Sequence, residues 1–440
     1  MQIQEISVTG LFGTFDHVVP LNMSDRITIV HGPNGFGKTA MLRLLNGFFN
    51  SEYSVFQVIP FSKFKILFNN GNHVEISKSL KKFTKRGDSE EIVLDFYSSS
   101  LQKETFCVKP AEKQKSRNLM IQYLLSRQDQ RIIESSDIVE DRSSSKVKSK
   151  EEPEWLKTLK TDVHIRLIES QRLLNIVSKD DSEISISFGT NDKTSSMLPT
   201  ISAYSDEIAQ ILRDKFTEYG VISQSLDRTF PNRLVQRQLS PNSTDEQLLD
   251  RLEQLEVTRS RLIEIGLLDK TENSDFSIQS PAIDESTKNI LSVYIEDVEK
   301  KLNVFNDVAS KIDLLRKIIN IKFAYSYKEM NFSKDKGFVF KTRYNSSLSS
   351  SDTLSPTDLS SGEQHELVLL YELLFKVEPK SLVLIDEPEL SLHVGWQVQF
   401  LKDLQEIVKL ADLDILMATH SPDIIQDRWD LTVELKGLKK

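Results

Sequence analysis

The sequence predicts an α/β protein in which a mixed sheet is flanked by helices and a helical, short coiled-coil subdomain is inserted. Three observations support this prediction. A glycine-rich loop joins a short apolar strand to an amphipathic helix within residues 27–49. Three further apolar strands, at 163–168, 381–385 and 414–418, each run into polar or acidic residues. Between the first and second of these strands, a long helical stretch carries a seven-residue apolar repeat.

Composition is that of an ordinary globular protein. The chain has 440 residues, of which 39% are apolar and 28% charged, enough for two or three domains with a sizeable core. Its net charge of −9 excludes a global basic field that would attract nucleic acid, although a local basic patch stays open. One cysteine, Cys107, excludes a disulfide framework. Without a signal peptide or an apolar run of ~18–20 residues, we expect a cytoplasmic protein with no membrane span.

The glycine-rich loop reads HGPNGFGKT at residues 31–39 and has the spacing of a phosphate-binding loop. Because glycine lacks a Cβ, Gly32, Gly35 and Gly37 let backbone N–H groups turn towards phosphate oxygens. The N-terminus of the following helix adds its dipole. The nucleotide-binding residues that we predict are Gly32, Pro33, Asn34, Gly35, Phe36, Gly37, Lys38, Thr39 and Ala40.

Two residues of this loop carry the predicted chemistry of ATP and Mg²⁺ binding. Lys38 is expected to reach the β- and γ-phosphates, and the Thr39 hydroxyl is expected to bind Mg²⁺. Phe36 is unusual, since small residues are common at its position. Its side chain either packs on the domain or covers the nucleotide, and the sequence leaves both alternatives open.

The strand at 381–385 ends in Asp386 and Glu387, which is the Walker B arrangement. Asp386 is predicted to hold the Mg²⁺ shell. Glu387 is predicted to be catalytic, because it is placed to polarise water for attack on the γ-phosphate. The alternative is an acidic turn after a structural strand.

Two other strand ends provide further candidates. His420 follows the strand at 414–418 and is predicted to be catalytic, as a donor to the γ-phosphate. Gln171 follows the strand at 163–168 and is predicted to complete the Mg²⁺ shell. Each residue alone would more often be structural, and their shared position at strand ends favours the functional interpretation.

Residues 359–364 read LSSGEQ, which resembles the signature of ABC-type ATPases. Together with GPNGFGKT, LVLIDEPELSLH and ATHSP, this segment gives the chain a resemblance to ABC-type ATPases of the SMC and RecF kind. The stretch DEPELSLH, followed by Trp396 and Gln397, resembles a subgroup of bacterial antiviral systems that includes the OLD-family nucleases. Within it, the ATPase subunit of Septu (PtuA) is preferred and that of PARIS (AriA) is the second choice.

The resemblance implies a homodimer, or a higher oligomer, that sandwiches two ATP molecules head to tail. Ser360 and Gly362 would contact the γ-phosphate held by the opposite protomer, with Glu363 beside them. Ser361 replaces the first glycine of the usual signature. Residues 389–393 look like the segment that communicates across such a dimer. A signature helix without its own P-loop lysine needs a partner to supply the nucleotide.

Three regions are predicted: an N-terminal ATPase lobe at 1–175, a helical insertion at 195–320 and a C-terminal ATPase lobe at 322–440. A polar loop at about 131–154 is expected to be mobile. The insertion is expected to form an antiparallel helical pair or a small bundle. Its apolar seam comprises Leu291, Ile295, Val298, Leu302, Phe305, Ala309 and Ile312, with a shorter companion at Leu248, Leu252, Leu255 and Leu262.

A basic cluster lies between two strand-like runs at 73–77 and 90–96. A solvated turn is the favoured interpretation of such a short charge run, and contact with nucleic acid is the alternative. The cluster comprises Lys78, Lys81, Lys82, Lys85 and Arg86.

Four functions remain open at this point. The favoured one is a defence ATPase that controls a nuclease effector in trans, preferably of the HNH type, because the chain carries no nuclease motif and ends soon after His420. A RecF-like DNA-repair ATPase is the main alternative, followed by a nucleotide-bound scaffold with little turnover. A transporter ATPase is least favoured, because a long insertion separates Gln171 from Leu359.

Overall fold

The computed structural model divides the chain into two compact units. Unit 1 comprises Met1–Arg172 and Val377–Lys440, and unit 2 comprises Leu173–Lys376. The signature segment at 359–364 therefore falls in unit 2. The residues that the structure describes are 1–81, 89–98, 102–108, 152–169, 198–236, 244–268, 284–343, 353–390 and 392–437.

A parallel sheet of five strands lies at the centre of unit 1, in the order β14-β3-β13-β12-β8. Its inner strands are almost entirely apolar and buried, as expected for a parallel sheet that is covered on both faces. The strands are β3 (Ile27–His31), β8 (Ile165–Ile168), β12 (Leu382–Asp386), β13 (Asp414–Ala418) and β14 (Thr432–Glu434).

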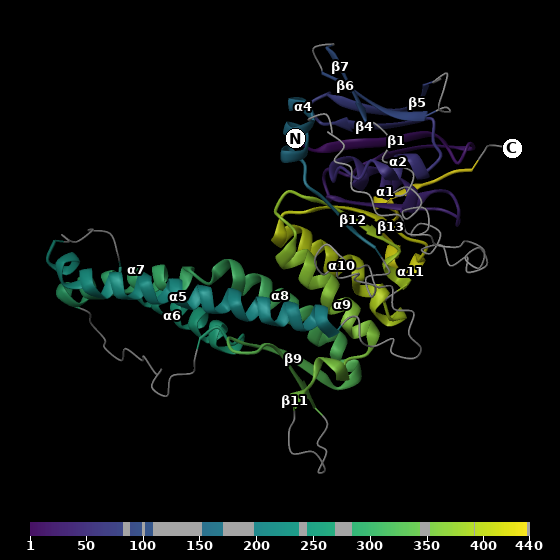
Figure 1. Cartoon of the computed structure of the whole chain (residues 1–440). Coiled ribbons are helices and arrows are strands. Elements are labelled where there is room, and N and C mark those ends of the chain that lie inside the picture. The colour runs from purple at the N-terminus through teal and green to yellow at the C-terminus, as the bar shows by residue number, and fades with distance from the viewer. Residues whose placement is uncertain are drawn as a thin grey trace, which may run out of the picture. The chain divides into compact units, whose positions relative to one another are not determined.

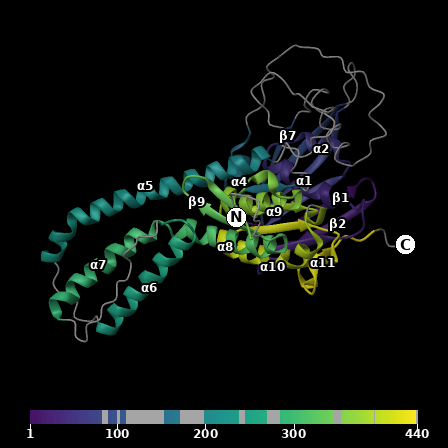
Figure 2. The ribbon, with the colours of Figure 1, turned by 90° about the horizontal axis from the view of Figure 1, so that it is seen from below.

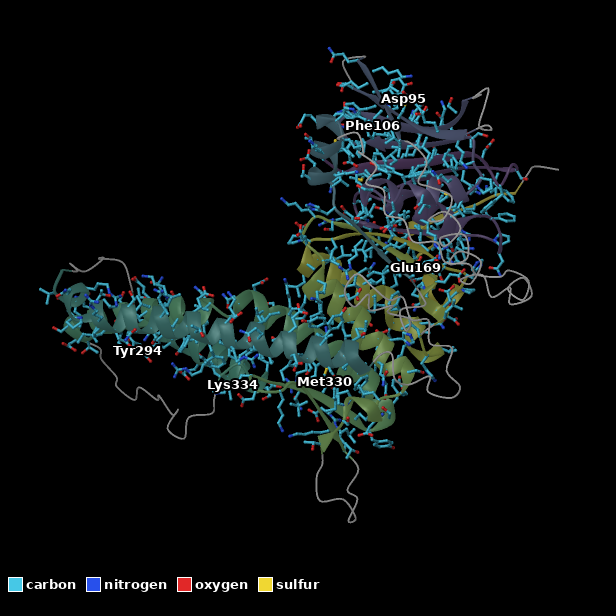
Figure 3. All side chains as sticks on the ribbon, viewed as in Figure 1. Asp95, Phe106, Glu169, Tyr294, Met330 and Lys334 are labelled. Carbon is cyan, nitrogen blue, oxygen red and sulfur yellow. The ribbon has the colours of Figure 1, made fainter. Side chains whose placement is uncertain are left out.

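An antiparallel sheet of six strands forms the second sheet of unit 1, in the order β2-β1-β4-β5-β6-β7. Alternating side chains separate its apolar face from its polar face: Asp95 accepts a hydrogen bond from Thr105, whereas Phe106 packs against the core (Figure 3). The strands are β1 (Ile3–Leu11), β2 (Phe15–Pro20), β4 (Lys63–Phe68), β5 (His73–Lys81), β6 (Ser89–Tyr97) and β7 (Lys103–Val108).

Helices lie on both faces of the parallel sheet of unit 1 (Figure 1). Helix α1 lies between the two sheets, where its buried face joins both of them in one apolar cluster that includes Phe48 and Leu384. Helices α10 and α11 cover the other face of the parallel sheet (Figure 1). The helices are α1 (Lys38–Phe49), α2 (Ser54–Val58), α4 (Glu154–Asp162), α10 (Val394–Ala411) and α11 (Pro422–Ile425).

Four long helices of unit 2 form a bundle (Figure 2). Ion pairs join successive positions of α6 to successive positions of α7 and α8 in the same order, so α6 runs parallel to α7 and α8. The ion pairs between α5 and α7 follow the opposite order, so α5 runs antiparallel to α7. The apolar seam of α7 and α8 is buried in the bundle. The helices are α5 (Leu198–Gln236), α6 (Asp245–Glu264), α7 (Glu285–Asn303) and α8 (Asn306–Phe323). The defining pairs are Lys288–Asp245, Arg251–Glu299 and Arg316–Glu264 for the parallel neighbours, and Arg233–Asp297 and Lys301–Asp227 for the antiparallel ones.

The rest of unit 2 combines a small sheet with the signature helix α9 (Ser361–Tyr371). Strands β9 (Lys328–Ser333) and β10 (Gly337–Thr342) form a hairpin, and β11 (Thr353–Leu354) pairs with β10. A π-helical turn at Glu372–Lys376 continues α9. Met330, labelled in Figure 3, is fully buried on the inner face of this hairpin.

The predicted mobile loop at 131–154 lies outside the described residues except for its last three, where α4 begins at Glu154. None of the helices in the described ranges is both long and apolar enough to cross a membrane.

Candidate functional site

The candidate site lies at the carboxyl edge of the parallel sheet in unit 1. Strand β3 runs into the glycine-rich loop, β12 ends at Asp386, and β13 is followed by Thr419 and His420. Because parallel strands end at the same edge, segments far apart in the sequence meet there. Asp386 lies opposite Ala418, which in turn lies opposite Val30.

The loop has the backbone that the sequence predicts for phosphate binding. Gly32, Gly35 and Gly37 adopt φ values of 151°, 84° and 91°, which L side chains rarely adopt. At Gly37 a Cβ would also lie 2.3 Å from Leu11 Cδ2, so the buried Leu11 side chain would have to shift to admit one. The helix α1 begins at Lys38, directly after this turn.

Phe36 packs on the domain, which is the first of the two alternatives left open by the sequence. Its ring lies 4.9 Å from the ring of Phe15 on β2, and it also lies close to Gly437, where an added Cβ would be 3.2 Å from the ring. The Phe36 carbonyl accepts a hydrogen bond of 2.8 Å from Nε2 of His17. The Phe36 side chain therefore packs against the protein and does not form a lid over the nucleotide site.

Thr39 and Asp386 come together as a pair of oxygen groups that fits Mg²⁺. The Thr39 hydroxyl donates to Asp386 Oδ1 at 3.0 Å. Burial raises the pKa of Asp386 to about 7, against the opposing effect of the Thr39 hydrogen bond. A carboxylate so removed from water is suited to a bound cation. Within the described residues no three His, Cys, Asp or Glu side chains gather as a metal cage, and Mg²⁺ with a nucleotide does not need one, because phosphates and water supply its other ligands.

Lys38 and His420 also meet at this edge. Lys38 Nζ donates to the carbonyl of Gly32 at 2.9 Å and forms a short hydrogen bond with Nε2 of His420. Burial, and then the Lys38 ammonium, lower the pKa of His420 despite the nearby Glu387 carboxylate. Neutral His420 is therefore the acceptor in this bond, since the Lys38 ammonium can only donate.

Glu387 occupies a backbone conformation that is uncommon for a residue with a side chain. Its φ is 45°, and its N–H donates to the Ala418 carbonyl at 2.8 Å. This turn places Glu387 Oε1 3.6 Å from Nε2 of His420. Strained backbone of this kind is concentrated at functional sites, and here it orients the predicted catalytic carboxylate.

Glu389 is a residue whose role the sequence did not reveal beyond its place in the segment 389–393. Its carboxylate accepts from the Thr419 hydroxyl at 2.8 Å and from the His420 backbone N–H at 2.6 Å. Gln397 extends this network by accepting from the Ser421 hydroxyl at 2.7 Å. Both residues thus hold the loop that carries His420. Their acidic and amide types are the only sequence signals, because the partners of Glu389 are 30 and 31 positions away and that of Gln397 is 24 positions away.

The predicted signature residues cap helix α9 in unit 2. Ser360 and Glu363 form a reciprocal capping box, with Glu363 N–H donating to Ser360 Oγ and Ser360 N–H donating to Glu363. Glu363 also accepts from Ser326 and Lys328, so its carboxylate is committed within unit 2. Ser360 and Ser361 are exposed, and Gly362 is partly exposed.

Two sequence predictions concern residues that lie wholly or partly outside the described ranges. Gln171 lies outside the described residues, although nearby Glu169 forms an ion pair of 3.1 Å with Arg43 (Glu169 is labelled in Figure 3). Of the basic cluster, Lys82, Lys85 and Arg86 are also outside. Lys78 is described, and its Nζ donates to the Ile59 carbonyl at 2.9 Å.

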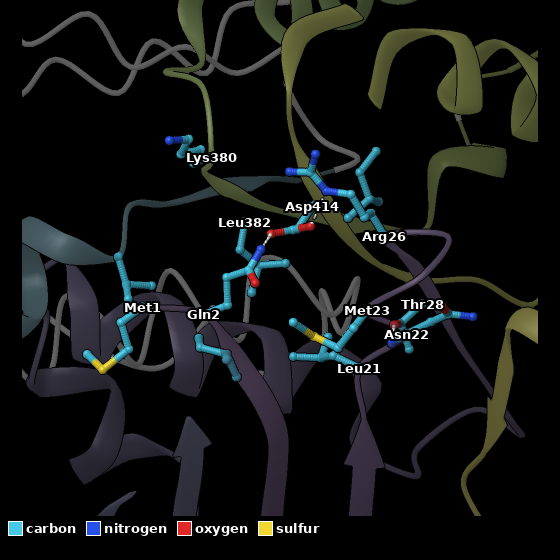
Figure 4. A pocket seen from close by; sticks show the side chains of 13 residues that line it. Met1, Gln2, Leu21, Asn22, Met23, Arg26, Thr28, Lys380, Leu382 and Asp414 are labelled. Atoms are coloured by element: carbon cyan, nitrogen blue, oxygen red, sulfur yellow. Dashed lines mark hydrogen bonds and ion pairs between the residues drawn. The ribbon is translucent and has the colours of Figure 1, made fainter. Parts of the chain in front are cut away.

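A small pocket in unit 1 lies away from the candidate site. It has a volume of about 20 Å³ and is lined by Gln2, Arg26 and Asp414 among others (Figure 4). Asp414 begins β13, so this pocket lies at the amino edge of the parallel sheet, opposite to the glycine-rich loop. Asp414 accepts a hydrogen bond from Arg26 at 2.7 Å, and this ion pair joins the amino ends of β13 and β3.

A phosphate-binding loop, a buried strand ending in adjacent acidic residues and a parallel sheet that joins them define a P-loop ATPase, with the predicted α/β fold. The model of the AAA ATPase domain family matches residues 1–425 of the chain. The chain therefore belongs to this family and is an ATPase.

Among curated proteins, protein ea59 of Escherichia phage lambda is 38% identical over 69 residues. The match spans 16% of this chain and only 13% of that protein. Among solved structures, the Smc head domain of Pyrococcus furiosus, bound to the C-terminal domain of ScpA, is 12% identical, with 99% of this chain and 94% of that chain covered and a TM-score of 0.36. The SMC head domain of Thermotoga maritima is 8% identical, with 97% and 92% covered and a TM-score of 0.32.

Proposed function

We propose that this chain is an ABC-type ATPase that binds Mg²⁺·ATP at the carboxyl edge of its parallel sheet. The observation that carries this proposal is the meeting of Thr39, Asp386, Glu387 and His420 around Lys38. Thr39 Oγ1 lies 3.0 Å from Asp386 Oδ1, and Glu387 Oε1 lies 3.6 Å from Nε2 of His420, which is hydrogen-bonded to Lys38 Nζ. Magnesium ion, when bound, would offset phosphate charge, and Thr39 and Asp386 would hold it.

The residues of the chain divide the work of hydrolysis among them. Lys38 would exchange its bond to the Gly32 carbonyl for phosphate oxygens, which are stronger acceptors. Glu387 would orient a water molecule and accept its proton. His420, whose loop is held by Glu389, would donate a hydrogen bond to the γ-phosphate once Lys38 has moved to phosphate oxygens.

The proposal includes a head-to-tail dimer in which two ATP molecules are sandwiched. Exposed Ser360 and Ser361 at the N-terminus of α9 support it, because backbone N–H groups there can bind an anion that their own unit does not supply. Gly362 permits close approach of that anion. Nucleotide binding would then act as a switch that assembles protomers, and hydrolysis would reset it.

Defence against phage is the biological role that we propose, in the cytoplasm, with a nuclease effector supplied in trans and preferably of the HNH type. The sequence DEPELSLH and the likeness to the Septu subunit support this role. A RecF-like role in DNA repair uses the same ATPase site and is the second candidate. The helical bundle of unit 2 favours neither.

The two roles can be separated with the native cells. We expect purification of the tagged chain to recover a nuclease, and deletion of its gene to raise the efficiency of phage plating. If no nuclease is recovered, and the deletion strain is sensitive to DNA damage but not to phage, the proposed role in defence is wrong and the role in DNA repair takes its place. A scaffold without turnover would bind ATP but release no phosphate, whether its role lies in defence or in repair.

A further inference from the structure

A histidine on β2 contacts the tip of the glycine-rich loop. His17 is only 3% exposed and lies on the apolar face of its sheet, where an imidazole needs a hydrogen-bond partner. Its Nε2 lies 2.8 Å from the carbonyl oxygen of Phe36. Because a carbonyl can only accept, His17 carries its proton on Nε2. The ring is stacked on Phe15 at 5.7 Å, which fixes its orientation.

The position of this carbonyl decides where the next N–H points. In a planar trans peptide, the C=O of Phe36 and the N–H of Gly37 point in opposite directions. Because the Phe36 carbonyl points to His17, the Gly37 N–H points away from His17. Phosphate-binding loops bind phosphate through such backbone N–H groups, and this orientation leaves the Gly37 N–H available for that role.

The peptide needs such a restraint because a glycine follows Phe36. A flip of the Phe36–Gly37 peptide rotates ψ of Phe36 and φ of Gly37, and Gly37, which has a φ of 91° here, also tolerates the alternative φ that a flipped peptide requires. A flipped peptide would present the Phe36 carbonyl to the phosphates and repel them. Packing of Phe36 against Phe15 restrains the side chain, but it does not by itself fix the carbonyl.

We propose that His17 is a positioning residue for ATP binding, whose Nε2–H holds the Phe36–Gly37 peptide in the orientation that offers the Gly37 N–H to phosphate. The inference rests on the proposed role of residues 32–39 as the ATP-binding loop. It adds a residue from a strand that carries no nucleotide-binding motif.

Two polar substitutions in the full chain test the donor directly. In His17→Gln the amide nitrogen can replace Nε2, whereas in His17→Asn it is too short and replaces Nδ1 instead. We expect the KM for Mg²⁺·ATP to rise about tenfold in His17→Asn, as one lost hydrogen bond would give, and to stay within about threefold in His17→Gln. The kcat should change less than about threefold in both variants, because the lost contact serves ground state and transition state alike.

Amide hydrogen exchange in the peptide covering residues 34–40 gives a second measurement. Added Mg²⁺·ATP should slow exchange there in the wild type and in His17→Gln, and should slow it less in His17→Asn. His73→Asn on β5 is the matched control, since that histidine is separated from β2 by β1 and β4. It should leave KM and exchange unchanged.

Equal KM values in folded His17→Asn and wild type would overturn the inference, and so would equal impairment of the Gln and Asn variants. Lys38→Ala distinguishes this failure from failure of the loop assignment. If Lys38→Ala loses ATP while both His17 variants behave as wild type, only the role of His17 is refuted. If Lys38→Ala binds ATP normally, the loop assignment itself is wrong.

Discussion

Thr39 Oγ1 donates a hydrogen bond to Asp386 Oδ1 at 3.0 Å, although 347 positions separate the two residues. Thr39 lies at the start of α1, after β3 and the glycine-rich loop, and Asp386 ends β12. In the sheet β3 and β12 are not neighbours, because β13 lies between them. The pair therefore forms only when three strands are in register. The predicted Mg²⁺ ligands are thus set by the sheet and not by the glycine-rich loop alone.

Replacement of Glu387 should separate ATP binding from hydrolysis. We expect Glu387→Gln to lower phosphate release by about 10²–10⁴-fold, because the amide cannot accept a proton from water. ATP should still bind, so a stable ATP-bound dimer should be seen by size-exclusion chromatography with light scattering. Glu378→Gln, at an exposed residue of the same unit, is the control. Unchanged phosphate release in Glu387→Gln would refute its catalytic role.

Glu389 should matter for turnover more than for nucleotide affinity. Glu389→Ala removes the acceptor for both the Thr419 hydroxyl and the His420 N–H, so the His420 loop loses its support. We expect kcat to fall about 10–100-fold, as for a misplaced catalytic group, with little change in KM. Glu389→Gln should give an intermediate kcat, since its single acceptor oxygen serves one donor well. A kcat equal to wild type in the Ala variant would contradict this role.

Gly37→Ala should abolish ATP binding through the backbone. The new Cβ would meet Leu11 and would force a residue with a side chain to φ 91°, a strain of about 1–3 kcal/mol. Gly13→Ala is a matched control, because Gly13 has φ 76° but open space around its Cβ. Both variants should unfold at lower temperature than wild type. Only Gly13→Ala should regain thermal stability when Mg²⁺·ATP is added.

Glu363 should make unit 2 sensitive to acid. Burial acts to raise the pKa of Glu363, but hydrogen bonds from Ser326 and Lys328 outweigh it, and the pKa is lowered. A carboxyl group with a lowered pKa stabilises the fold above its unfolded pKa and loses that effect as pH falls through its folded pKa. Glu363→Gln should therefore unfold more easily than wild type at pH 7, by about 1–3 kcal/mol.

The same comparison at low pH provides the check on Glu363. In chemical denaturation, the difference in unfolding free energy between wild type and Glu363→Gln should shrink as pH falls below the ordinary range of a glutamate. A difference that is constant from pH 7 to pH 3 would show that the charge contributes nothing.

Sequence reasoning located the strand ends of unit 1 because each combines an apolar run with a chemically distinctive end. Asp386 ends β12, whose other residues are apolar, and His420 comes shortly after β13, which is apolar after Asp414; burial of parallel strands requires such apolar runs. The glycine-rich loop is visible for a similar reason, since its residue types are dictated by backbone geometry. These signals are local in the sequence and can be recognised without knowledge of the fold.

Residues that act across the fold could not be found in this way. His17 contacts Phe36 only because β2 lies beside the loop, and nothing near His17 in the sequence indicates it. The sequences of α6 and α7 show similar apolar seams, but a seam does not tell whether two helices run parallel or antiparallel. Here they run parallel, because α5 is the helix that packs antiparallel to α7. Pairing of elements is a property of the whole chain, whereas periodicity is a property of a segment.

The discontinuity of unit 1 has a consequence for its synthesis. Strands β3 and β8 leave the ribosome before unit 2, whereas β12 and β13, which lie between them in the sheet, leave after it. At about 5–20 residues per second, synthesis of unit 2 takes roughly 10 to 40 s, so the edge of β8 waits at least that long for its neighbour β12 and the edge of β3 waits longer for β13. During that interval the nascent chain exposes unpaired strands, and a chaperone that shields such edges would raise the yield of folded protein.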